Sequence, residues 1–278
     1  MITTRDQLIN SIANNSSRIL IDKASLANAA AAQLHSLWRA TGQPGQGAIP
    51  GAAARCTHAL NGAINFTQQV SPSTSYLTIL EGLCANAGTT LEVYDRLMHM
   101  GGLNGTLTTA QTVGIDISAN LGSDNMANRI GDANYSDILW FLEWYTDTGG
   151  TGANITVNVT YNDATTGNLS VITLGGTRRA SFMQPLNGFI PAADSGKYIR
   201  AVNSITLSAS TTAAGSFGVT ATRYRCGMYK PLPNARFISD WAALGLPEIH
   251  NSSCLFLAQL ANTTSTGIVR GTGKISHG

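Results

Sequence analysis

The first candidates for chemistry are the acidic and imidazole side chains between residues 81 and 99, namely Glu81, Glu92, Asp95 and His99. Two carboxylates about 5–10 Å apart across a cleft can cleave a glycosidic bond as an acid and a base or nucleophile. Spacing along a sequence does not establish such a separation. The surrounding residues favour two β-strands with solvated carboxylates, so we predict no catalytic residue in this group.

The cysteines and histidines lack the spacing of a metal site. The cysteines are Cys56, Cys84, Cys226 and Cys254. None belongs to a CxxC pair, and we expect Cys84, Cys226 and Cys254 to be reduced, buried packing residues. His35 is expected to be a hydrogen-bonded structural side chain within a helix. The isolated histidines are His58, His250 and His277.

Motifs that bind phosphate or build a hydrolase site are missing. Residues 42–54 are rich in glycine, but proline stands at position 50, where G-x-G-x-x-G requires glycine. Gly273-Lys274 is followed by Ile275 where a phosphate loop requires Ser or Thr. We therefore predict a protein that is not an enzyme and that has no cofactor and no metal.

An aromatic run, ILWFLEWYT at residues 138–146, leaves three interpretations open. Alternation along a strand places Trp140 and Trp144 on one face and Phe141, Glu143 and Tyr145 on the other. Because both faces are largely apolar, a central strand in the core is favoured. A subunit interface is the next alternative for the two tryptophans, and a sugar-stacking platform is the last.

Arginines form the one basic concentration in the sequence: Arg178 and Arg179 are adjacent, and Arg223 and Arg225 follow later. Arginine pairs well with carboxylates and carbonyls in interfaces. We therefore expect Arg178 and Arg179 to contact a partner subunit.

The composition excludes several kinds of partner. Charged residues make up 12% of the chain, about half of the roughly 25% usual in soluble domains. The formal net charge is +2 without basic clusters, which argues against direct nucleic-acid binding. No apolar stretch approaches the roughly 20 residues of a membrane span, and the N-terminus lacks the apolar core of a signal peptide.

The first forty residues are predicted to be mostly helical. Thr4 and Gln7 have capping-box spacing, and Leu8, Ile9 and Ile12 lie on one face of the helix that follows. A second helix is predicted after Asp22 or Ser25, with an apolar stripe of Leu26, Ala30, Leu34, Leu37 and Trp38. We expect this segment to clasp a neighbouring subunit through Leu8, Ile9, Ile12 and Trp38.

After residue 60 the sequence changes to short apolar and β-branched runs separated by Gly, Asn and Thr turns. Residues 76–83 and 90–98 are predicted as a hairpin, and residues 254–261 are predicted to pair with 268–275. Residues 155–161 alternate as a half-exposed antiparallel strand does. Further strands are expected at residues 138–146, 169–174, 198–209 and 217–228.

These runs predict a mainly β protein with an antiparallel β-sandwich or jelly-roll-like fold and an N-terminal helical segment. Two parts are expected: residues 1–60 as a helical arm and Gly/Pro loop, and residues 61–278 as the β-sandwich domain. Long strands such as residues 155–161 carry no lysine that would guard an edge. Neighbouring copies in a symmetric assembly are expected to cover them.

The chain resembles virion structural proteins of tailed bacteriophages. The resemblance runs through LHSLWRATGQPGQGAIP (34–50), NYSDILWFLEWYTD (134–147), NITVNVTYND (154–163), ALGLPEIHNSSCLFL (243–257) and the end TSTGIVRGTGKISHG. It spans most of the chain but contains no catalytic motif, so it carries over no functional residue.

The resemblance implies a non-enzymatic particle component located in the virion and assembled in the bacterial cytoplasm. A capsid decoration (cement) or minor capsid protein is favoured, with the major capsid protein and copies of itself as partners. A neck, tail or baseplate component that binds a receptor or glycan is the alternative.

Overall fold

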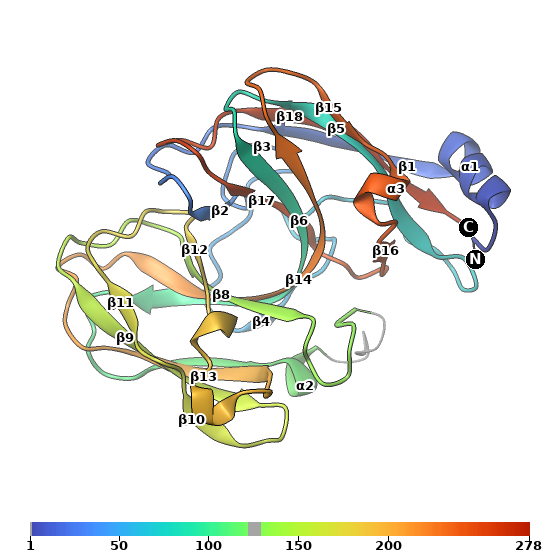
Figure 1. Cartoon of the computed structure of the whole chain (residues 1–278). Helices are drawn as coiled ribbons and strands as arrows, with labels where there is room; N and C mark the ends of the chain where they lie inside the picture. The colour runs from blue at the N-terminus through green and yellow to red at the C-terminus, as the bar shows by residue number, and fades with distance from the viewer. Residues whose placement is uncertain (1, 122–128) are drawn as a thin grey trace. The chain divides into compact units, whose positions relative to one another are not determined.

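The structure is a computed structural model that describes residues 2–121 and 129–278 (Figure 1). It is mainly β, with antiparallel sheets in a sandwich-like arrangement and one N-terminal helix, as the sequence predicts. The chain divides into two compact units. Unit 1 comprises Met1–Ala48, Thr57–Asp95 and Arg225–Gly278, and unit 2 comprises Ile49–Cys56 and Arg96–Tyr224. A separate arm of residues 1–60 stays a prediction.

Unit 1 is built on a sheet with the strand order β15-β5-β18-β1-β3, to which β16 adds by pairing with β5. Its strands are β1 (Ser16–Lys23), β3 (Gly42–Gln43), β5 (Ser75–Cys84), β15 (Phe237–Ser239), β16 (Glu248–Ile249) and β18 (Val269–His277). A second layer pairs β2 (Leu34–Ser36) with β17 (Leu255–Leu260) and β17 with the first half of β6 (Thr89–Asn104).

Alternation of side chains explains the core of unit 1. In β1 the burial pattern places Ile19, Ile21 and Lys23 inward and their neighbours outward. Ile19 and Ile21 pack with Leu80 of β5 and Leu257 of β17 in one apolar cluster. Two sheets whose inner faces share such a cluster form a sandwich.

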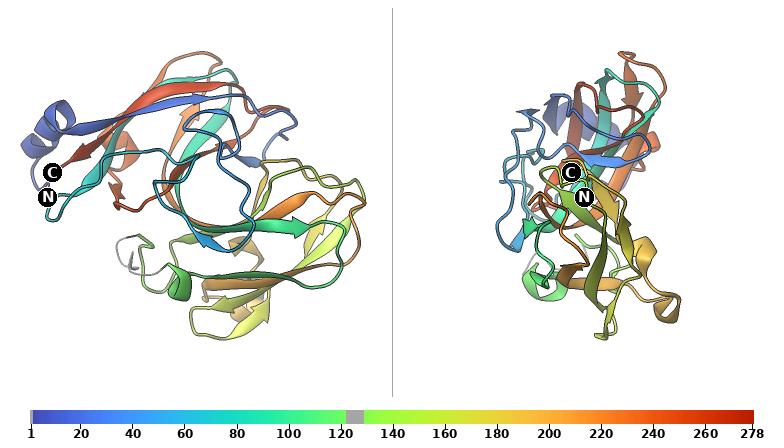
Figure 2. Two further views of the ribbon diagram at one scale, coloured as in Figure 1. Left: turned by 180° about the vertical axis from the view of Figure 1, so that it is seen from behind. Right: turned by 90° about the vertical axis from the view of Figure 1, so that its left-hand side faces the viewer.

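Helix α1 (Arg5–Asn14) begins as predicted, because the Thr4 hydroxyl accepts from the Gln7 amide and the Gln7 side chain accepts from Thr4. Its Ser11 Oγ donates to the His277 carbonyl at 2.8 Å, which holds the helix against the end of β18. Figures 1 and 2 show the two chain termini side by side at this place. The short helix α3 spans Trp241–Leu244, and the Asp240 side chain caps it by accepting from the Ala242 and Ala243 amides.

The predicted second helix is wrong. Residues 34–36 form β2, and the backbone at Asn28 and Ala32 has positive φ values of 64° and 60°, which a right-handed helix cannot include. Residues 34–36 pair with β17 instead, and Leu37 directly after them is buried. Trp38 is 1% exposed and packs edge-on against Phe256. Tertiary packing therefore overrides the local helical pattern.

Both predicted hairpins of unit 1 are also wrong. β5 and β6 do not pair with each other, and neither do β17 and β18, because each connection passes from one sheet of the sandwich to the other. Turn-forming residues reverse the chain but do not specify which strand becomes the partner.

Unit 2 has one sheet with the order β10-β9-β13-β7, with β11 also paired to β9. Its strands are β7 (Gln111–Asp116), β9 (Ala153–Tyr161), β10 (Thr166–Asn168), β11 (Ile172–Leu174) and β13 (Ile199–Leu207). The facing layer pairs β8 (Ile138–Trp144) with β12 (Met183–Pro185) and β14 (Ser216–Lys230), and β4 (Ala54–Arg55) with β6. The helical turns are α2 (Ile117–Asn120), Asn187–Phe189 and Ala192–Asp194.

Strand β9 confirms the predicted alternation, with Ile155, Val157 and Val159 buried on one face. It is not an unguarded edge, however. β13 pairs with one side of β9, and β10 and β11 pair in succession with the other. The chain therefore covers this strand itself, and the expectation that neighbouring copies cover it is wrong.

The glycine-rich stretch serves the packing of Trp38. A Cβ atom added at Gly47 would lie 2.1 Å from the Trp38 ring, and one added at Gly62 would lie 2.7 Å from it. The indole nitrogen of Trp38 donates to the Ala48 carbonyl at 3.0 Å. Glycine is required at position 47 so that the loop can lie against the ring.

Gly47→Ala is expected to lower the free energy of unfolding by about 1–3 kcal/mol, because the added methyl group overpacks the Trp38 ring. Gly45→Ala is the matched control, since a Cβ atom there would meet nothing within 4 Å. Urea denaturation measures both variants. Equal stability of the two would contradict this packing role.

His35 predicts an acid-dependent loss of stability. Burial lowers the pKa of His35 to about 4, and the Ala30 amide donates to its Nε2 at 3.1 Å. The unfolded imidazole has a pKa near 6.5. The unfolded state therefore binds more protons between pH 4 and 6.5, and stability falls as the pH falls through this range.

We expect wild type to lose stability relative to His35→Gln as the pH is lowered from 6.5 to 4, because glutamine does not titrate. Urea denaturation of both proteins at several pH values measures this difference. Parallel pH dependence would show that His35 does not carry the effect.

Candidate functional site

The acidic group found in the sequence does not form a catalytic site. Asp95 is 1% exposed and accepts from the Ser253 hydroxyl and the Cys254 amide, each at 2.8 Å. Glu81 pairs with Arg236, and Glu92 accepts from the Tyr94 hydroxyl. These contacts are structural, although Asp95 is buried where a solvated carboxylate was expected.

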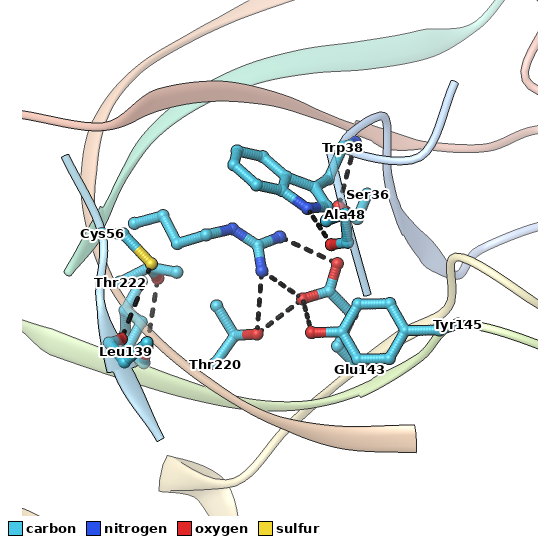
Figure 3. Close-up of polar contacts among 11 residues, drawn as sticks. Ser36, Trp38, Ala48, Cys56, Leu139, Glu143, Tyr145, Thr220 and Thr222 are labelled. Atoms are coloured by element: carbon cyan, nitrogen blue, oxygen red, sulfur yellow. Dashed lines mark hydrogen bonds and ion pairs between the residues drawn. The ribbon is translucent and has the colours of Figure 1, made fainter. Parts of the chain in front are cut away.

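A buried ion pair is the strongest electrostatic feature of unit 2. Arg96 of β6 donates to both oxygens of Glu143 of β8, at 2.7 and 2.8 Å, and the two side chains are 0% and 1% exposed. The Thr220 hydroxyl donates to Glu143 Oε2 at 2.5 Å and the Tyr145 hydroxyl at 3.3 Å (Figure 3). Bidentate geometry and two further donors stabilise the carboxylate in its charged form.

The protonation states of Arg96 and Tyr145 in this cluster are fixed. Burial acts to lower the pKa of Arg96, but the adjacent Glu143 carboxylate outweighs burial and raises that pKa. Burial and the Glu143 charge raise the pKa of Tyr145, so the phenol keeps its proton. A general acid or base needs a pKa near the working pH, and these groups are held away from it.

Other buried cations, such as Lys23 and Arg129, bind backbone carbonyls. Lys23 Nζ donates to the carbonyls of Ala40, Pro44 and Gly45 at 3.0, 2.7 and 3.3 Å. Burial lowers the pKa of Lys23 to about 8. Arg129 donates to the carbonyls of Cys56 and Arg96 at 2.7 and 2.9 Å. These contacts tie loops to strands and leave the cations inaccessible to a substrate.

All four cysteines are buried and none forms a disulfide, as predicted for Cys84, Cys226 and Cys254; the fourth is Cys56. Burial raises the pKa of the Cys226 thiol to about 12, which keeps it unreactive. Over residues 2–121 and 129–278, no group of three or more His, Cys, Asp or Glu side chains could hold a metal ion. None of the described helices is long and apolar enough to cross a membrane.

The aromatic candidates lie in the cores of their own units. Trp140 and Trp144 of β8 are 0% and 1% exposed, and Trp38 is equally enclosed. Trp144 stacks on Phe182 and Phe217 with ring centroids 5.3 and 6.1 Å apart. The interpretation of β8 as a central core strand is confirmed, and these three rings have no surface to offer to a partner subunit or a sugar.

The other predicted interface residues differ in how far they are exposed to solvent. Leu8 is buried, Ile12 is half-buried and Ile9 is 55% exposed. Arg179 is exposed and pairs with Asp147 at 2.7 Å, whereas Arg178 lies over the Phe182 ring. An interface role stays a prediction for the exposed Ile9 and Arg179.

The sequence reasoning missed an exposed face of the unit 1 sheet, which we call the arginine face. Its outward side chains come from β1, β18, β5 and β15, which run side by side in Figure 1. They are Arg18, Leu20, Asp22, Arg270, Thr272, Lys274, Ile79, Glu81, Leu83, Arg236 and Ile238.

Strand register places these side chains in rows across the sheet. Leu20 is opposite Thr272, Thr272 is opposite Glu81, and Glu81 is opposite Ile238. Neighbouring strands lie about 4.8 Å apart, so one row extends over about 14 Å. Leu20 and Ile238 at its ends are 54% and 62% exposed. The face therefore presents aliphatic side chains to solvent over several strands.

A shallow hollow of about 480 Å³ lies in the arginine face. Leu20, Leu83 and the backbone of Gly82 and Gly271 are part of its lining, and three arginines border it: Arg18, Arg236 and Arg270. Ion pairs join Arg270 to Asp22 and Arg236 to Glu81. Exposed pairs of this kind are worth about 1 kcal/mol or less, so a partner can displace them.

Glu143→Gln is expected to lower the free energy of unfolding by about 3–5 kcal/mol, because it leaves Arg96 buried without a counter-charge. The double variant Arg96→Met/Glu143→Leu is expected to lose much less, since it removes both charges. Urea denaturation, monitored by tryptophan fluorescence, measures the stability of both variants. A Glu143→Gln protein as stable as wild type would contradict the structural role of the pair.

Comparison with known proteins identifies no relative by sequence: no family model and no curated protein matches the chain. Solved structures that it resembles are capsid proteins of infectious bursal disease virus. The VP2 subviral particle matches with 13% identity and a TM-score of 0.18, over 95% of this chain and 79% of that one. The T=1 and T13 particles match with 10% identity and TM-scores of 0.18 and 0.19, over 95% of this chain and 77% of each. TM-scores of this size do not establish a shared fold, so no function is transferred from them.

Proposed function

We propose that this protein is a non-enzymatic structural component of a virus particle, and specifically a capsid decoration or minor capsid protein of a tailed bacteriophage. Each copy bridges neighbouring major capsid subunits and covers apolar and strand surface at their junction. The partners are the major capsid protein and further copies of this chain, and the protein resides in the virion.

The arginine face is the observation that carries this proposal. Leu20 and Ile238 protrude from a sheet face whose register extends over four strands. Apolar patches bordered by polar residues mark sites of protein contact. Repetition by particle symmetry makes even a modest contact strong, because every copy adds to the total avidity.

The titratable groups support a structural role. Asp95, Arg96, Glu143, Lys23 and Arg129 are each held by fixed partners inside the protein. The sequence resemblance to virion structural proteins of tailed bacteriophages gives the kind of particle.

A neck, tail or baseplate protein that binds a receptor or glycan is the second candidate. It requires exposed aromatic rings for stacking on sugars. Trp140 and Trp144 are buried and Trp241 is half-buried, so the described tryptophans do not favour this role.

Particles that lack this protein are expected to lose thermal or osmotic robustness before they lose their shape, because the bridges between shell subunits are missing. Heating and osmotic-shock series on deleted and complete particles measure this, with genome release as the readout. Re-adding the purified protein should restore robustness. Equal robustness of deleted and complete particles would overturn the cementing role.

A further inference from the structure

We infer that the arginine face binds an extended acidic segment of another protein chain that carries both carboxylates and aliphatic side chains. This inference rests on the proposed function, because it specifies the chemistry of the surface that a neighbouring shell subunit presents.

The net positive charge of the chain is concentrated on this face. The cations there are Arg18, Arg236, Arg270 and Lys274, and the anions are Asp22 and Glu81. The face thus carries an excess of two positive charges, which equals the formal net charge of +2 of the whole chain. The remaining cations and anions balance, so the arginine face is where an acidic partner is attracted.

The three arginines are positioned to bind carboxylates. Arg236 and Arg270 have side chains that are 72% and 61% exposed, and their present partners are carboxylates of the same face. Arg18 donates to the Thr272 hydroxyl at 3.3 Å. A guanidinium group binds a carboxylate in a bidentate fork, and a partner that brings several carboxylates adds such contacts without breaking buried structure.

The centre of the face favours aliphatic side chains over a phosphate backbone. The hollow between the arginines is lined by Leu20, Leu83 and glycine backbone, which an aliphatic side chain can fill. Nucleic acid and anionic lipid therefore fit less well than an acidic aliphatic peptide.

A second copy of the same face does not fit. In a two-fold symmetric contact each surface meets itself, so the excess arginines would face one another. Like charges placed opposite each other in an interface are costly. The occupant is therefore a different surface, with alternating aliphatic and acidic residues that match the two-residue period of a strand.

The test measures binding of the full-length chain to fluorescein-labelled peptides by anisotropy. The probe is an eight-residue peptide of alternating leucine and glutamate. Comparison peptides alternate serine with glutamate or leucine with lysine, and single-stranded oligo-dT and phosphatidylglycerol vesicles represent the other anionic partners. We expect the leucine–glutamate peptide to bind at least about tenfold more tightly than every comparison probe, with affinity that falls as salt rises.

Two variants locate the site. Arg236→Gln/Arg270→Gln is expected to weaken binding of the leucine–glutamate peptide by about tenfold or more, and Leu20→Thr by about fivefold. The matched controls are Arg179→Gln, which removes an exposed, ion-paired arginine of unit 2, and Val171→Thr, which changes a side chain 56% exposed. All five changed side chains are exposed, and circular dichroism checks that each variant is folded.

The inference is overturned if the peptide does not bind, if the control variants weaken binding equally, or if oligo-dT or vesicles bind more tightly. These outcomes do not affect the proposed function, which the presence of the protein in purified particles tests separately. Peptide binding by a protein that is absent from particles would overturn the proposed function and leave the binding surface established.

Discussion

Unit 1 depends on the backbone pairing of β18 with two strands that are distant in the sequence. β18 lies between β1 and β5 and runs antiparallel to both, from Val269 to His277. The strands approach closely where Gly82 is opposite Gly271, since a Cβ atom at either position would lie within 2.2 Å of a backbone oxygen of the facing strand. Neither the sheet nor the arginine face exists until residues 269–277 have joined residues 16–23 and 75–84.

That constraint links the fold to its proposed use. The same pairing that buries Ile19 and Ile21 on one side of β1 displays Arg18 and Leu20 on the other. The outward side chains acquire their order only from the register between strands. A partner that binds across several strands consequently recognises the folded sheet and not a short linear motif, which suits a protein that must bind after it has folded.

Buried and exposed charges have different roles in this protein: the buried ones stabilise the fold, and the exposed ones serve recognition of a partner. Inside the protein, Arg96 and Glu143 neutralise each other, and Lys23 and Arg129 bind carbonyl oxygens. Such groups specify a packing arrangement, and their removal one at a time is costly. Asp95 and Lys230 are also buried, and the arginine face carries an excess of two cations at the surface. Charged residues make up only 12% of the chain. The buried ones stabilise the fold, and the exposed ones on the arginine face attract a partner.

The sequence predicts those features that depend on neighbours along the chain. The capping box of Thr4 and Gln7 and the alternation of β9 are local patterns, and the structure confirms both. The helix predicted through Leu34 and Trp38 failed because residues 34–36 pair with β17 and Trp38 packs against Phe256 of that strand. Both hairpins failed because turn residues do not specify which sheet receives the next strand. The arginine face was missed for the same reason, since Leu20, Glu81 and Ile238 meet only through registers between distant strands.

The measurement that tests the central claim most directly is the copy number of this protein in purified particles, determined by quantitative mass spectrometry against the major capsid protein. A decoration protein that bridges shell subunits must be present in a ratio close to that of those subunits. Absence of the protein from the particle would contradict the structural role altogether, and a ratio far below that of the shell would contradict its position on the capsid.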